Sequence, residues 1–110
     1  MTNTDSLMLF SVVPGLPALK VEQSDIKARS TTVTWSYSPK SDEAPIVSFY
    51  LHYQNTSFND DVTLSGAFKS KELINLKPYT SYSVRMMAES VLGRGVWGSF
   101  VNFNTSTDGM

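Results

Sequence analysis

The chain has 110 residues, a net charge of −1 at pH 7 and no cysteine. This length fits one domain, and a hydrophobic content of 41% is sufficient for a folded core. The lack of cysteine excludes a disulfide framework, a thiolate nucleophile and a cysteine metal site, and the near-neutral charge argues against nucleic acid as a partner.

An apolar run near the N-terminus extends from Leu7 to Val13. It has no positively charged segment before it and is too short to span a bilayer, so it predicts neither a signal peptide nor a membrane helix. Its two remaining interpretations are an edge strand and the end of an upstream domain. We expect residues 1–13 to be a flexible extension or linker, 14–106 to form the domain and 107–110 to be a tail, all within a longer protein.

Beyond this run, short stretches of alternating hydrophobic and polar residues predict β-strands. In chain order, the predicted strands cover residues 18–23, 30–37, 46–55, a less defined 62–64, a strand closed by Leu73 and Leu76, 82–89 and 100–105. The polar segment 55–61 predicts a turn that includes Asn59-Asp60-Asp61, and Gly93-Arg94-Gly95 predicts the turn before the last strand. Since no segment has a helical period, the sequence predicts a seven-stranded antiparallel sandwich of two sheets.

A tight corner is predicted just before the sixth strand, from Leu76 to Tyr82. Pro78 fixes its own φ and cannot donate to a sheet, and Thr80 favours a turn. Tyr82 stands at the mouth of the strand, where its ring can enter the core while its hydroxyl bonds the backbone of the corner. The alternation then directs Val84 inward.

These features together resemble a fibronectin type III domain, from about Pro17 to Thr105. The matching positions are Pro17, Trp35, Pro45 with Ile46 and Phe49, then Leu76, Pro78, Thr80 and Tyr82, and finally Ala88, Gly93 and Gly95. Ser90 departs from the pattern, because the family often has asparagine there. The resemblance implies an immunoglobulin-like sandwich of two sheets. One sheet holds strands A (18–23), B (30–37) and E (closed by Leu73 and Leu76). The other holds strands C′ (62–64), C (46–55), F (82–89) and G (100–105). The core residues are expected to be Trp35, Phe49, Leu51, Leu76, Tyr82 and Val84.

Residues suited to catalysis or metal binding do not form a recognisable set. His52 is the only histidine, and the Asn59-Asp60-Asp61 cluster lacks the spacing of a calcium loop. We therefore expect no catalytic residue, cofactor or metal, and we interpret the chain as a non-enzymatic module.

Two sequence triplets fit the acceptor pattern for N-linked glycosylation, at Asn55 after the third strand and at Asn104 at the end of the last. Both lie where a sugar could remain outside the fold. They favour an extracellular glycoprotein, with a cytosolic structural repeat as the rival interpretation.

The outer face of the C-F-G sheet is the candidate protein-binding surface. The residues predicted to line it are Tyr50, His52, Arg85, Met87, Arg94 and Trp97. Two alternatives remain open: a neighbouring domain covers this face, or Trp97 folds over the edge of the core. Arg85 could also stack on Tyr50 or Trp97 within the domain.

The functional hypothesis is an extracellular interaction and spacer module of a cell-adhesion molecule or receptor, monomeric in isolation. Its expected partners are cell-surface or matrix proteins or neighbouring domains. The alternatives are an accessory ectodomain module of a receptor tyrosine kinase or phosphatase, and an intracellular structural repeat. Neighbouring sequence would separate them, because a downstream apolar stretch of about 20 residues indicates a membrane receptor.

Overall fold

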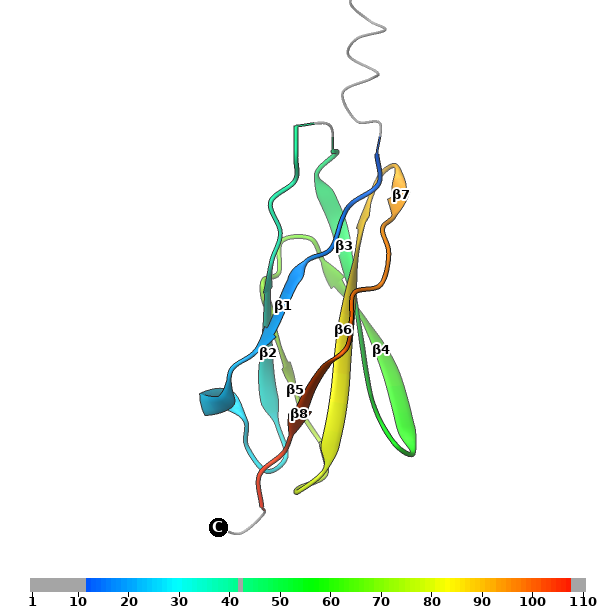
Figure 1. Ribbon diagram of the computed structural model, residues 1–110. Coiled ribbons are helices and arrows are strands. Elements are labelled where there is room, and N and C mark those ends of the chain that lie inside the picture. The colour runs from blue at the N-terminus through cyan, green and yellow to red at the C-terminus, as the bar shows by residue number, and fades with distance from the viewer. Residues whose placement is uncertain (1–11, 42, 108–110) are drawn as a thin grey trace, which may run out of the picture.

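The computed structural model describes residues 12–41 and 43–107, which form two antiparallel sheets packed face to face (Figure 1). The smaller sheet has the order β1-β2-β5, with β1 at Ala18–Val21, β2 at Thr31–Ser36 and β5 at Ser70–Leu73. The larger sheet has the order β4-β3-β6-β7, with β8 also paired to β6. Its strands are β3 at Ile46–Asn55, β4 at Phe58–Ser65, β6 at Ser81–Ser90, β7 at Gly93–Arg94 and β8 at Val101–Asn104. A 3-10 turn, η1 at Gln23–Asp25, follows β1.

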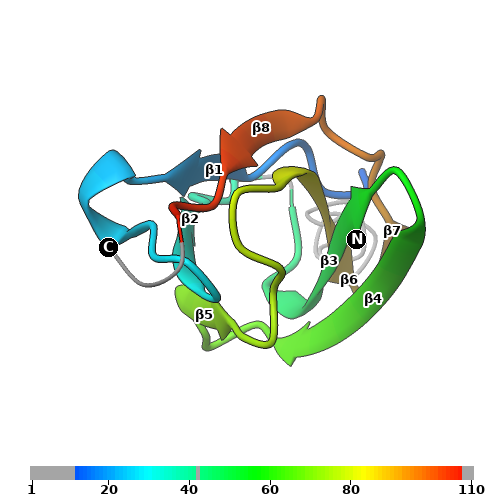
Figure 2. The same ribbon diagram turned by 90° about the horizontal axis from the view of Figure 1, so that it is seen from below.

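This arrangement confirms the predicted sandwich and both predicted sheets. Strands β1, β2 and β5 are A, B and E, and strands β4, β3, β6 and β8 are C′, C, F and G. Seen from below, β1 lies beside β8 along one side of the sandwich, and β4 and β5 lie along the other (Figure 2). The larger sheet therefore presents an outer face that runs from β4 across β3 and β6 toward β8.

At the centre of the larger sheet, β3 pairs with β6 in an antiparallel register that places Leu51 opposite Met86 and Tyr53 opposite Val84. Because side chains alternate along a strand, these residues point into the sandwich while Tyr50 and His52 point outward. The bounds of β3 agree with the predicted 46–55, and β6 is one residue longer at each end than predicted.

Strand β4 corrects the prediction of a polar turn over residues 55–61. The turn consists of Thr56 and Ser57 alone, and Asn59-Asp60-Asp61 lies within β4, paired with β3 along its whole length. Polar residues are tolerated here because β4 is an edge strand, and charge on an edge opposes pairing with other chains. The predicted strand at 62–64 thus lies in the second half of β4, which is longer than predicted.

Two further boundaries differ from the predictions. Strand β5 ends at Leu73, before Leu76, because Asn75 adopts a φ of 60°, which is incompatible with a strand. The turn after β6 is Val91-Leu92, whereas Gly93 and Arg94 already pair with β6 as β7. Gly93 has a φ of 137°, which explains why glycine is needed immediately after the turn.

The core lies between the two sheets. Trp35 from β2 meets Phe49 from β3 with ring centroids 5.8 Å apart in an edge-to-face arrangement. The six predicted core residues are all buried, together with Val33, Leu64, Leu73, Met86, Ala88 and Phe103. Trp35 therefore fills the space between the sheets.

The corner before β6 has the predicted geometry. The hydroxyl of Tyr82 accepts a hydrogen bond from the backbone N–H of Lys77 at 2.9 Å, while its ring stacks on Phe103 at 5.7 Å. Thr105 closes the corner, because its hydroxyl donates to the Lys77 carbonyl at 2.6 Å and accepts from the Thr80 N–H at 2.9 Å. The corner thus ties the end of β8 to the start of β6.

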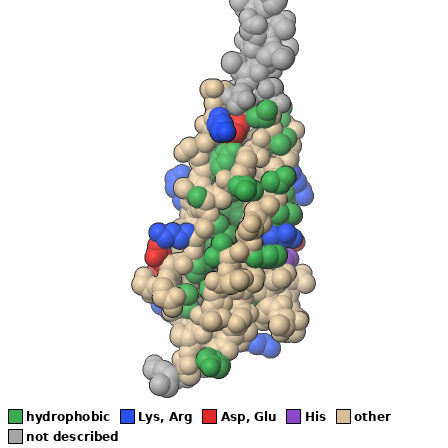
Figure 3. All heavy atoms as spheres, in the orientation of Figure 1, with side chains coloured by type: hydrophobic (Ala, Val, Ile, Leu, Met, Phe, Trp, Pro, Cys, Tyr) green, Lys and Arg blue, Asp and Glu red, His purple; other side chains and the backbone are tan. Residues whose placement is uncertain are grey.

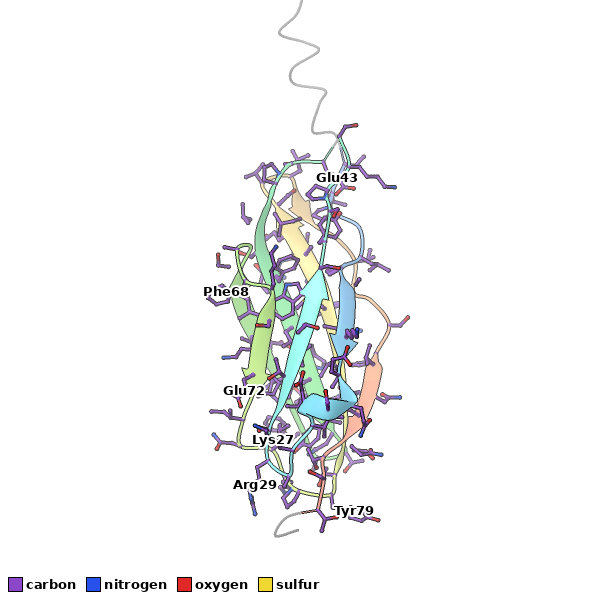
Figure 4. All side chains as sticks on the ribbon, turned by 90° about the vertical axis from the view of Figure 1, so that its left-hand side faces the viewer. Lys27, Arg29, Glu43, Phe68, Glu72 and Tyr79 are labelled. Carbon is purple, nitrogen blue, oxygen red and sulfur yellow. The ribbon has the colours of Figure 1, made fainter. Side chains whose placement is uncertain are left out.

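The described chain enters at one end of the sandwich and leaves at the other (Figure 1). At the entry, the N–H of Gly15 donates to the Tyr37 hydroxyl at 2.6 Å, and that hydroxyl donates to the Glu43 carboxylate. Figure 4 labels Glu43 at this end and Tyr79 at the opposite one. Residues 1–11 and 108–110 lie outside the described residues, so the predicted extension, tail and domain boundaries stay predictions.

Candidate functional site

The outer face of the larger sheet carries an array of arginine and aromatic side chains. Two cross-strand pairs of β3 and β6 form its base: Tyr50 faces Met87, and His52 faces Arg85. Residues from β7 and the segment that follows it complete the array from the other edge of β6. We call this set the arginine–aromatic array; its members are Tyr50, His52, Arg85, Arg94, Trp97 and Phe100. On the space-filling surface, the single histidine appears in purple next to basic and hydrophobic side chains (Figure 3).

Arg85 lies at the centre of this array. Its guanidinium carbon is 4.7 Å from the ring centroid of Trp97 and 4.7 Å from that of Phe100. Its Nε atom is buried and has no hydrogen-bond partner among the described residues. The two ring contacts are cation–π interactions, each contributing about 0.5–1 kcal/mol at exposed sites. Of the two stacking partners considered for Arg85, the structure selects Trp97.

His52 joins this group to β4. Its Nδ1 atom lies 2.5 Å from an Asp61 carboxylate oxygen, and its Nε2 atom lies 3.0 Å from Oε1 of Gln54. Its ring meets Trp97 edge to face, with centroids 6.1 Å apart. His52 is thus fixed in place by contacts on three sides, and its side chain is only 14% exposed.

A second cluster lies nearer the β7 end of the same face. The guanidinium carbon of Arg94 is 4.5 Å above the ring of Tyr50, and its Nε atom is 3.7 Å from the Glu89 carboxylate. The Tyr50 hydroxyl donates a hydrogen bond to Glu89, and this bond raises the pKa of Tyr50 above its ordinary value. The side chain of Arg94 remains 59% exposed, so most of it can still reach a partner.

Met87 corrects the predicted list of exposed residues, because it is only 6% exposed. Its neighbours explain the burial. On one side it is paired with Tyr50 of β3. On the other side, the backbone N–H groups of Gly95 and Gly98 donate hydrogen bonds to β6. The side chain of Met87 therefore points away from the core of the sandwich but is not exposed to solvent. It is buried on this face and is not a surface contact.

Phe100, Glu89 and Asp61 complete the face but were not among the predicted residues. Phe100 had a usable signal, since it begins the alternation that also directs Asn102 and Asn104 outward. Asp61 had no such signal, because the sequence around it resembles a turn. Each of the three contacts a different member of the array: Asp61 contacts His52, Glu89 contacts Tyr50 and Phe100 contacts Arg85.

The two candidate glycosylation sites have different surroundings. Asn55 is half-buried at the end of β3, where its Oδ1 accepts the backbone N–H of Ser57 at 2.8 Å. Asn104 is exposed at the end of β8, where its Oδ1 accepts the Ser81 hydroxyl at 2.6 Å. They lie at the same end of the sandwich as the corner.

The described residues contain no cluster of three or more histidine, cysteine or acidic side chains able to hold a metal ion. Nor does any helix within that part of the chain have the length and apolar character to cross a membrane.

The sequence matches the fibronectin type III domain family over residues 16–104, which is most of the chain. The chain belongs to the fibronectin type III family. The resemblance noted from Trp35, the Leu76–Tyr82 corner and the glycines after β6 is thereby confirmed.

Solved structures show the same fold. The FN1–FN3 domains of chicken CNTN1 superpose with a TM-score of 0.72 at 20% identity, over 86% of this chain and 33% of that one. A structure described as a myokine superposes with a TM-score of 0.73 at 23% identity, over 84% of this chain and 98% of that one. A computationally redesigned β-sandwich superposes with a TM-score of 0.71 at 21% identity, over 88% of this chain and 99% of that one. The chain thus spans about a third of the CNTN1 structure. A search of curated proteins gives no match.

Membership of this family narrows the functional classes. Fibronectin type III domains are typically non-catalytic, commonly mediate protein–protein interactions and are found in chains of several domains. These family properties direct attention to surfaces that another protein can contact.

Proposed function

We propose that this fibronectin type III domain is an extracellular protein-binding and spacer module of a cell-adhesion molecule or receptor, without catalytic activity of its own. It binds a partner protein through the arginine–aromatic array. The observation that carries this proposal is the position of Arg85 between the rings of Trp97 and Phe100, with Arg94 over Tyr50 beside it.

The composition of the array suits a protein interface. Arginine, tryptophan and tyrosine are the residues most enriched at binding hot spots, where a few side chains carry most of the free energy. Stacking also restricts Arg85 before any partner arrives. Since an immobilised long side chain costs about 0.5–1.5 kcal/mol on binding, this restriction favours affinity.

The extracellular and spacer parts of the proposal have separate support. Two N-glycosylation triplets lie in the domain, and members of this family are commonly extracellular. The entry and exit of the described chain at opposite ends of the sandwich suit a module strung between neighbours (Figure 1).

The binding test compares substitutions in the array with a substitution on the opposite sheet. Fluorescent tetramers of the domain are applied to cells of the tissue that expresses the parent protein, and surface binding is measured by flow cytometry. Arg94→Glu and Trp97→Ala should each lower binding at least tenfold, the effect of a hot-spot residue. Lys20→Glu is the matched control, because Lys20 is 66% exposed on β1 of the opposite sheet.

Unfolding of each variant in urea verifies that its fold is retained. If both array variants bind as well as the wild type, the proposed surface is wrong. Location is tested separately by glycosidase treatment and intact mass of the natural protein from its own cells: sugar on Asn55 or Asn104 supports an extracellular location. Bare asparagines at both sites favour the intracellular repeat instead.

A further inference from the structure

A pocket of about 500 Å³ opens at the end of the sandwich between the β3–β4 hairpin and the segment that follows β5. This volume is within the range of sites for small ligands, about 300–1,000 Å³. On one wall the rings of Tyr53 and Phe58 meet edge to face at 5.7 Å, and Ile74 lies on the other. Phe58 and Ile74 are 44% and 58% exposed, so apolar surface remains uncovered at the mouth. Apolar residues gathered around a hollow, unlike isolated ones, indicate a surface that something covers.

Asn55 is part of the wall of this pocket. It is paired with Phe58 as the last residue pair of the hairpin, so both side chains lie on the same side of the larger sheet. Ser57, the third residue of the glycosylation triplet, lines the pocket as well. A sugar attached to Asn55 would therefore begin at the pocket, within reach of the exposed ring of Phe58.

The Asn55 amide presents its oxygen, and not its nitrogen, to Ser57. Its oxygen accepts the Ser57 N–H at 2.8 Å and lies 3.4 Å from the Ser57 hydroxyl. An N–H donor requires an acceptor, so the bonded atom is Oδ1 and the nitrogen Nδ2 occupies the other branch of the amide. Nδ2 is the atom that N-linked glycosylation modifies.

We propose that an N-linked glycan on Asn55 places its first N-acetylglucosamine in this pocket, with the C–H face of the sugar against Phe58 and Ile74. In the attachment step, Nδ2 forms a bond to C1 of the sugar while the bond from C1 to a lipid diphosphate breaks; the diphosphate leaves and Nδ2 loses one proton. The inference rests on the proposed extracellular function, since attachment takes place in the secretory pathway.

The polar rim of the pocket fits the same occupant. Asn75 and Lys77 belong to its lining, and they offer donors and an acceptor to sugar hydroxyls and to the acetamido group. Such a mixture of an apolar wall with a few polar groups is typical of small-molecule sites.

Asn104 supplies an internal control. It is exposed on β8 and does not belong to the lining of the pocket beside Asn55. The N–H of Ser106, the third residue of its triplet, donates to the Lys27 carbonyl at 3.1 Å and is not turned toward Asn104. A glycan there should extend into solvent.

The test uses the 110-residue chain secreted from a eukaryotic cell line that adds high-mannose glycans. Asn104→Gln leaves only the Asn55 glycan, and Asn55→Gln leaves only the Asn104 glycan. Each protein is compared in two forms: trimmed by an endoglycosidase to a single N-acetylglucosamine, and made without sugar in bacteria. The single sugar on Asn55 should raise the Tm by about 4–8 °C, the shift that one modest contact produces in a domain of this size, and the sugar on Asn104 should not.

A further variant distinguishes binding of the sugar in the pocket from a general effect of glycosylation on stability. Phe58→Ser in the Asn104→Gln background keeps the triplet but removes the apolar wall, so the rise in Tm should disappear. Nuclear Overhauser contacts between the sugar and the Phe58 ring should be present in the parent protein. An unmodified Asn55 in the secreted chain, or an occupied one with neither contacts nor a rise in Tm, overturns the inference. Because secretion is imposed, neither result bears on where the natural protein resides or on its array.

Discussion

The hydroxyl of Tyr82 provides the sharpest test of the corner. Tyr82→Phe removes the acceptor of the Lys77 N–H but keeps the ring, which is buried and stacks on Phe103 at 5.7 Å. Leaving a buried donor without a partner costs about 1–3 kcal/mol. Since this bond is only partly buried, we expect a loss of about 1–2 kcal/mol in the free energy of unfolding. Urea unfolding followed by tryptophan fluorescence measures it, with an unchanged m-value.

Tyr79 offers a matched control three residues earlier in the same corner. It is 83% exposed and lies at the outer end of the sandwich (Figure 4), so Tyr79→Phe removes the same atom without removing a buried bond. Its expected effect is within about 0.5 kcal/mol of the wild type. If Tyr82→Phe is no more destabilising than Tyr79→Phe, the hydroxyl does not hold the corner and the reasoning fails.

Three further predictions concern the core, the entry segment and pH. Trp35→Ala should lower the free energy of unfolding by about 3–5 kcal/mol in the same urea assay, because the ring fills the space between the sheets. Gly95→Ala should accelerate proteolysis near Pro14, since a Cβ there would lie 2.3 Å from the Pro14 carbonyl oxygen, whereas Gly98→Ala meets nothing closer than 3.6 Å and should not. Burial raises the pKa of Tyr37, so stability should be constant below the ordinary tyrosine pKa and fall as pH rises through about 10 and above. Alkaline unfolding curves check this, and Tyr37→Phe should fall less steeply; an equal slope would contradict it.

The parts of the fold that the sequence predicts well are those where one side of a strand is buried. In β3, Phe49 and Leu51 alternate with more polar positions over ten residues, and the bounds agree with the structure. The Tyr82 corner was predictable for a different reason, because Pro78 and Thr80 restrict the backbone locally. In both cases the signal is contained in a few consecutive residues.

The first half of β4 was missed, and only residues 62–64 were predicted as a strand, because the signal for the rest is not local. Asn59, Asp60 and Asp61 have low strand propensity, and they adopt a strand because β3 offers backbone hydrogen bonds along eight paired positions. Strand propensity depends strongly on such neighbours, so an edge strand rich in aspartate resembles a loop in sequence. The half-buried position of Asn55 follows from the same hairpin, which the predicted turn over residues 55–61 did not contain.

The arginine–aromatic array shows how much of a binding face can be predicted from the alternation of side chains along a strand. The period places Arg85 and Met87 on the same face of β6, yet Met87 is buried and Arg85 is held between two rings. What separates them is the path of the chain after β7, where the N–H groups of Gly95 and Gly98 bond to β6 and bring Trp97 over Arg85. Those glycines were visible in the sequence, but their effect depends on contacts across the sheet, between Gly95 and Ala88 and between Gly98 and Met86. The contribution of Arg85 to binding should therefore depend on Trp97, because the ring fixes the guanidinium that a partner would meet.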